Sequence, residues 1–179
     1  MILASFILVF LLSCLVIYYT FINSKFLSSM TGMVVAMTNS MMTSVAIGTF
    51  LGISIQDKDL AIPTIIAVSI GMVVGYGTGR PISLMASLEG FSAGIMGGMM
   101  GAMLGVMLSP QSAEIIVYFI DVINFFISVL LLRIMDEEMK TNHIEPSKNK
   151  TLIVSFIVIG VLFLLMSLLF NLNLQLGFR

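Results

Sequence analysis

The sequence predicts an all-α integral membrane protein, a polytopic bundle of about six transmembrane helices in a single domain over residues 1–179. Hydrophobic residues make up 59% of the chain and charged residues only 9%, whereas soluble domains carry roughly 25% charged residues. The apolar residues also fall into six segments, each close to the roughly 20 residues that a spanning helix needs. The lipid bilayer is therefore the expected partner, and with a net charge of −1 no nucleic acid is expected.

The first three predicted helices are apolar segments separated by polar residues, at 1–21, 29–55 and 60–79. Residues 1–21 lack a positively charged start, and their apolar run is too long for a cleaved signal peptide. The segment around Cys14 loosely resembles a lipoprotein cleavage site, but the apolar run continues beyond it, so we expect a retained helix. Asn23 to Lys25 ends this helix, and the polar turn at 56–59 ends the second.

The last three predicted helices span residues 82–108, 113–135 and 152–172. Gly79 to Pro81 forms a tight turn before the fourth helix, because proline suits the first turn of a helix. Ser109 and Pro110 offer a cap and a first-turn proline for the fifth helix. A charged loop at 136–150 separates the fifth and sixth helices.

The distribution of lysine and arginine predicts a cell-membrane protein with both termini outside. Cytoplasmic segments carry an excess of these residues. With the N-terminus outside, only Lys58 and Arg179 lie outside, and the loop at 136–150 is cytoplasmic. The cytoplasmic side then holds six basic residues: Lys25, Arg80, Arg133, Lys140, Lys148 and Lys150.

The second to fourth helices form a glycine- and methionine-rich group. Between Met30 and Met107 lie 12 of the 16 methionines and 13 of the 15 glycines. Small residues four positions apart share a helix face and allow close approach of membrane helices. We therefore expect these three helices to form a tight inner core, and a glycine stripe left unused would support a homo-oligomer or contact with other membrane proteins. The predicted packing glycines are Gly71, Gly75, Gly90, Gly94, Gly98, Gly101 and Gly105.

Two methionine sets suggest a soft-metal path. Met33, Met37 and Met41 share one helix face, as do Met99, Met103 and Met107. Neutral thioethers suit Cu(I), which would be a solute; no resident cofactor is expected. The alternative is that these flexible side chains fill gaps beside glycines. The sets begin at depths that differ by roughly 20 Å, which allows two sites on one path but no single shared site.

The spacing of these methionines is similar to that in Ctr-type copper transporters, which also carry a GxxxG helix. The similarity covers the two methionine sets and implies Cu(I) handling. The rest of the chain departs from the three-helix Ctr pattern, since it has about six predicted helices. Both sets belong to the pattern G-M-x-x-A-M-x-x-x-M, repeated 66 residues apart. Duplication and convergence on a packing pattern both explain this repeat.

Four polar residues at membrane depth are candidate path residues: Glu89, Asp121, Asn39 and Asn124. Ionisable groups at this depth are costly and usually face a bundle interior or cavity. Glu89 has a structural alternative, an ion pair with Arg80. Asp121 has another, a hydrogen bond to a neighbouring helix.

The sequence thus predicts a small multi-pass transporter or permeation protein, with Cu(I) as the most specific solute. The second to fourth helices would line the path. The alternative is a non-catalytic subunit or assembly factor that binds partner membrane proteins through its glycine-rich faces, and a channel formed by oligomers is a third reading. We expect no enzyme activity, because the only histidine, His143, lies in the charged loop and the glycine-rich segment at 75–79 has no following lysine.

Overall fold

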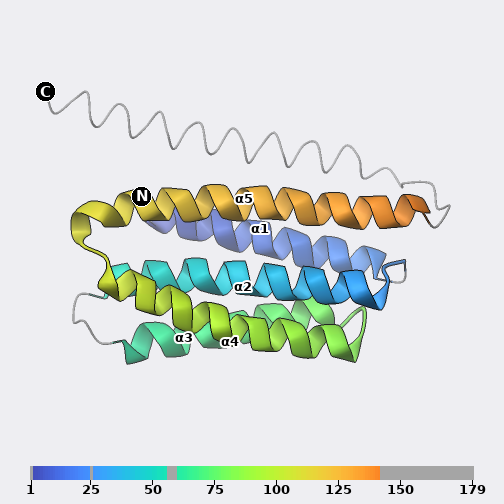
Figure 1. The fold of residues 1–179 in the computed structure, drawn as a ribbon, viewed down its shortest axis with the longest axis horizontal. Helices are drawn as coiled ribbons and strands as arrows, with labels where there is room; N and C mark the ends of the chain where they lie inside the picture. Colours follow the sequence, from blue (N-terminus) through green and yellow to red (C-terminus); the bar gives the residue numbers. More distant parts are fainter. Residues whose placement is uncertain (1, 25, 56–59, 142–179) are drawn as a thin grey trace, which may run out of the picture.

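The computed structural model describes residues 2–24, 26–55 and 60–141. This part of the chain is all-helical (Figure 1). Four of its helices contain stretches long and apolar enough to cross a membrane, while the first contributes a shorter apolar stretch at Val9–Asn23. The predicted sixth helix at 152–172 lies outside the described residues. The described helices are α1 (Ile2–Asn23), α2 (Ser29–Ser54), α3 (Ala61–Gly79), α4 (Leu84–Met107) and α5 (Pro110–Thr141).

Serine caps fix the starts of α2 and α4. The Ser28 hydroxyl accepts a hydrogen bond from the backbone N–H of Thr31 at 3.3 Å, and that of Ser83 accepts one from Ala86 at 3.1 Å. Each bond satisfies a backbone donor that has no partner within its helix. Because Ser83 is the cap, α4 begins at Leu84 and not at residue 82 as the proline turn predicted.

Helix α5 extends further than the sequence predicted, since residues 136–141 are helical and not part of a loop. Glycine and proline are absent from this stretch, and Asp136 lies four residues before Lys140, a spacing that supports a helix. Two contacts with other parts of the chain also anchor it. The Tyr19 hydroxyl donates to Asp136 at 2.6 Å, and the backbone N–H of Ser28 donates to Glu138 at 3.0 Å.

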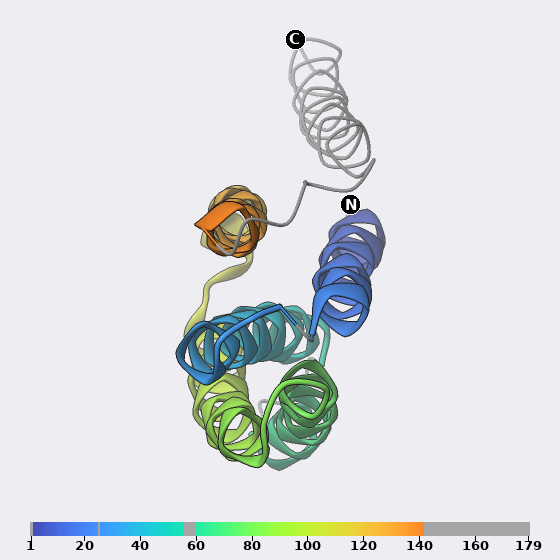
Figure 2. The same ribbon diagram turned by 90° about the vertical axis from the view of Figure 1, so that its right-hand side faces the viewer.

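Helices α2, α3 and α4 form a three-helix group held by main-chain contacts (Figure 2). A Cβ added to Gly71 would lie 2.8 Å from the carbonyl oxygen of Gly94, and one added to Gly101 would lie 2.7 Å from the Cα of Val45. The two glycine stripes of α4 therefore serve different neighbours. Gly90, Gly94 and Gly98 contact α3, whereas Gly97, Gly101 and Gly105 contact α2.

Helices α1 and α5 contact each other and pack on α2, on the side away from α4 (Figures 1 and 2). Two clusters of buried apolar side chains hold α1 and α5 against α2. The first lies near the Ser28 end of α2 and comprises Val16, Tyr19, Leu27, Val35, Leu131, Met135 and Met139. The second lies toward the other end and comprises Val9, Ala46, Phe50 and Val117.

Candidate functional site

The interior of the three-helix group leaves no path at its glycine contacts. A Cβ on Gly90 would lie 2.6 Å from the Gly75 carbonyl oxygen, and one on Gly48 would lie 2.7 Å from the backbone nitrogen of Ala102. The Ser40 hydroxyl closes the same region by donating to the Gly71 carbonyl oxygen at 2.8 Å. A route lined by the inside of α2, α3 and α4, as the sequence suggested, therefore does not fit this packing.

A buried polar layer lies between the two apolar clusters of α1, α2 and α5. It comprises Ser13, Thr43, Asp121, Asn124 and Ser128, each at most 5% exposed. Each shares a helix face with cluster residues, because the spacings are three, four or seven positions. Ser13 lies between Val9 and Val16, Thr43 three residues before Ala46, and Asp121 four residues after Val117. The α1–α2–α5 layer is thus apolar at both ends and polar in its middle.

The hydroxyl oxygen of Ser13 and the side-chain nitrogen of Asn124 have no hydrogen-bond partner among the described residues. The hydroxyls of Ser128 and Thr43 form hydrogen bonds within their own helices. Ser128 donates to the carbonyl oxygen of Asn124 at 2.8 Å, and Thr43 donates to that of Asn39 at 2.7 Å. A buried polar group without a partner costs roughly 1–3 kcal/mol, so the layer is suited to a further polar ligand.

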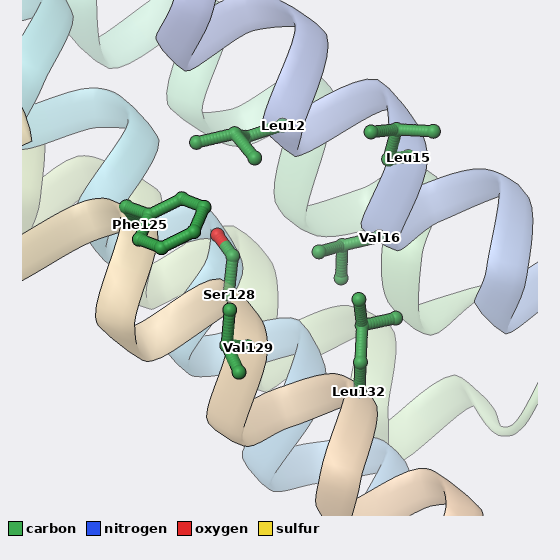
Figure 3. A pocket seen from close by; sticks show the side chains of 7 residues that line it. All are labelled: Leu12, Leu15, Val16, Phe125, Ser128, Val129 and Leu132. Atoms are coloured by element: carbon green, nitrogen blue, oxygen red, sulfur yellow. The ribbon is translucent and has the colours of Figure 1, made fainter. Parts of the chain in front are cut away.

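A small cavity of about 20 Å³ adjoins this layer between α1 and α5 (Figure 3). Its wall is apolar except for Ser128, which also belongs to the polar layer. The cavity marks a loosely packed seam between the two helices. The lining residues are Leu12, Leu15, Val16, Phe125, Ser128, Val129 and Leu132.

The methionines of α4 face outward. Met99 is 53% exposed, Met103 55% and Met107 75%, and Met96 and Met100 are also more than half exposed. They do not fill gaps at the glycine contacts, which lie on the other faces of α4. By contrast, Met135 is fully buried in an apolar cluster. We call the surface formed by Met96, Met99, Met100, Met103 and Met107 the α4 methionine face.

The methionines of α2 lie at a different level from this face. Met41 lies beside Gly97, and Thr49 lies beside Gly105, so the parallel helices α2 and α4 are offset by 56 residues. By this offset Met33 is level with Glu89, ten residues or about 15 Å before Met99. Met33 and Met41 are partly buried, whereas Met37 is 45% exposed. The methionine sets of α2 and α4 therefore lie at different depths along the bundle. Their separation of about 15 Å is smaller than the roughly 20 Å predicted from the sequence.

The four candidate path residues lie in three different places. Asp121 and Asn124 lie together in the polar layer. Asn39 points toward α3, where its side-chain nitrogen donates to the Thr78 hydroxyl at 3.2 Å. Glu89 lies on the outer side of α4, on the same face as Met96 and Met100.

The ion pair considered for Glu89 is absent from the described part of the chain, where its carboxylate makes no hydrogen bond or ion pair. The Arg80 guanidinium lies instead over the Tyr76 ring, 5.6 Å from its centroid. A carboxylate on an outward face near membrane depth favours a polar or protein neighbour over lipid alone.

Sequence reasoning did not find Ser13, Thr43 and Ser128. Ser128 had a readable signal, because Asp121, Asn124 and Ser128 follow one another at helical spacing on one face. Ser13 and Thr43 had none, since their role depends on the pairing of α1 and α2 with α5.

A scan against protein-family models and searches of curated proteins and of solved structures found no match to this chain.

Proposed function

We propose that this chain is a small multi-pass membrane transporter or permeation protein that handles a soft metal ion such as Cu(I) along the α4 methionine face. The observation that supports this most is the exposure of its five thioethers. From Met96 to Met107 they cover eleven residues of helix, or about 16 Å. Thioether sulfur binds Cu(I) without losing a proton, so it remains a ligand inside a membrane.

The outward direction of this face changes where the path is placed. Because glycine contacts close the inside of the three-helix group, the metal would travel along the outer side of α4, between this helix and a second protein surface. A second copy of the chain would supply matching thioethers. Glu89, at the start of the same face, would attract the cation from the end of α4 that carries Ser83.

The alternative is a non-catalytic subunit or assembly factor that binds partners through glycine-rich faces. Of the thirteen glycines between Met30 and Met107, only Gly77 would leave an added Cβ with no atom within 4 Å. The other twelve already contact helices or turns of the same chain. Because these glycines already contact the same chain, no glycine stripe in this region is left to bind a partner protein. This disfavours partner binding through glycine-rich faces.

Copper uptake by proteoliposomes tests the proposal. The purified protein should give Cu(I) accumulation above that of empty liposomes, and a variant with Met99→Leu, Met103→Leu and Met107→Leu should lose it. Met30→Leu is the control, because Met30 is 77% exposed but lies on α2. Equal uptake by the wild type and the triple variant would refute the metal path. A partner complex broken by Gly77→Leu, with no uptake by the wild type, would favour the alternative.

A further inference from the structure

We propose that Met85 and Glu89 form an entry site for the α4 methionine face, in which one soft monovalent cation binds between the Met85 thioether and the Glu89 carboxylate. We call these two residues the entry pair. The inference rests on the proposed function, because it assigns the first binding site of the same solute.

The entry pair lies at the end of α4 that carries Ser83, on the same side of the helix as the α4 methionine face. Met85 is 60% exposed, and Glu89 is partly buried. Residues four positions apart on a helix are neighbours, with Cβ atoms about 5–6 Å apart, so both side chains can reach one ion. A single helix therefore brings the two ligands together, without any contact between helices.

Side chains with an oxygen or sulfur atom continue from the entry pair along the whole of α4. Ser92 is exposed and lies three residues after Glu89 and four residues before Met96, so it connects the entry pair to the methionine face. From Met85 to Met107 the row covers about 33 Å of helix, close to the roughly 30 Å of a bilayer's hydrocarbon core. An ion bound at the entry pair thus has a further ligand at each turn across the membrane. The row comprises Met85, Glu89, Ser92, Met96, Met99, Met100, Met103 and Met107.

The outward sides of α3 and α5 differ from this row. Within the described residues, their exposed large apolar side chains are isoleucine, valine, leucine, phenylalanine and tyrosine. On α4 itself, exposed leucines and a phenylalanine flank the row without entering it; they are Leu84, Leu88, Phe91 and Leu104. Contact with lipid alone therefore does not explain why methionine replaces these residue types along one side of α4.

Glu89 is the only charged residue of α2, α3 and α4. Thioethers are neutral, so a cation held by methionines alone keeps its full charge in apolar surroundings, which is costly. The Glu89 carboxylate cancels the charge of one monovalent ion, whereas a divalent ion would retain a net positive charge. The entry pair is thus the site on α4 that a soft monovalent cation fills first.

Silver titration of the full-length protein in detergent tests the entry pair. Ag(I), which mimics Cu(I), is added in chloride-free buffer and followed by calorimetry, in a Cys14→Ser background because the exposed thiol would bind silver itself. Met85→Leu and Glu89→Gln should each weaken the tightest silver site by about tenfold or more. Because both residues bind the same ion, the double variant should lose less affinity than the two single effects combined. Met30→Leu, an exposed methionine on α2, and Glu137→Gln, an exposed carboxylate on α5, are the controls and should match the parent protein.

The variant with Met99→Leu, Met103→Leu and Met107→Leu separates this inference from the proposed function. It should keep the tightest silver site, because the entry pair is intact, and lose weaker sites. Unchanged affinity in Met85→Leu or in Glu89→Gln would overturn the entry pair, and the metal path would still stand if the triple variant lost silver. Fully additive effects of the two single changes would also overturn it, since the residues would then not share an ion. A parent protein that binds no silver would refute both the entry pair and the metal path.

Discussion

Gly75 of α3 and Gly90 of α4 lie in main-chain contact, and a Cβ added to Gly90 would lie 2.6 Å from the carbonyl oxygen of Gly75. Neither helix has room for a side chain at this point. Without a hydrophobic driving force between helices in lipid, such close contact allows dispersion to hold them together. The contact also leaves no room for a solute between α3 and α4 at this point.

Gly90→Ala should destabilise the protein by about 1–3 kcal/mol, because the new methyl group overlaps main-chain atoms that cannot move independently. Gly77→Ala is the matched control, since the same methyl group would meet nothing within 4 Å and alanine favours helix. Thermal unfolding in detergent compares the two variants. Equal melting temperatures would show that α3 and α4 are not in contact as described.

Tyr19→Phe should lower the free energy of unfolding by about 1–2 kcal/mol, because it removes the 2.6 Å hydrogen bond to Asp136. Tyr18→Phe serves as the control, since Tyr18 is 63% exposed. The measurement is again thermal unfolding. If the two variants unfold at the same temperature, the hydrogen bond that joins α1 to the end of α5 does not stabilise the protein.

Asn39→Ala should cost about 1 kcal/mol of stability. The reason is that the Asn39 side chain bonds Thr78 on α3 and so holds two helices together. Ser69→Ala, on the exposed side of α3, should have little effect. Equal melting temperatures for Asn39→Ala and Ser69→Ala would show that Asn39 does not hold α2 against α3.

Cysteine labelling tests the predicted orientation of the helices in the membrane. Ser28 precedes α2 and Ser109 follows α4, and because these helices are parallel, the two exposed serines lie at opposite ends of the bundle. In a Cys14→Ser background, Ser109→Cys should react with an impermeant maleimide on intact cells. Ser28→Cys should react only after the membrane is opened. The reverse pattern would invert the topology.

Much of the helical layout could be predicted from the sequence, because apolar length and turn residues are local signals. The ends of α2 and α3 agree with the prediction within one residue. The sequence prediction ended α5 too early, at residue 135. Charged residues such as Asp136 suggested a loop, but they continue the helix because contacts with other parts of the chain hold it in place. The glycines at four-residue spacing lie at the contacts among α2, α3 and α4, as expected from their small size.

The site was less predictable than the fold. Helical spacing shows which methionines share a face, but not whether that face meets another helix or the surroundings. The outward direction of Met99 and Met103 became visible only once both glycine stripes of α4 were seen to be occupied. The polar layer likewise depends on the packing of α1 and α2 against α5, which brings together helices that lie far apart in the sequence.

Metal loading of the purified protein tests most directly whether the α4 methionine face binds a soft metal ion. The protein is incubated with Ag(I), which mimics Cu(I), then desalted, and its metal content is measured by mass spectrometry. The wild type should retain silver, and the Met99→Leu, Met103→Leu, Met107→Leu variant should lose most of it while Met30→Leu retains it. Equal silver in the wild type and the triple variant, or none in either, would contradict the proposed soft-metal function.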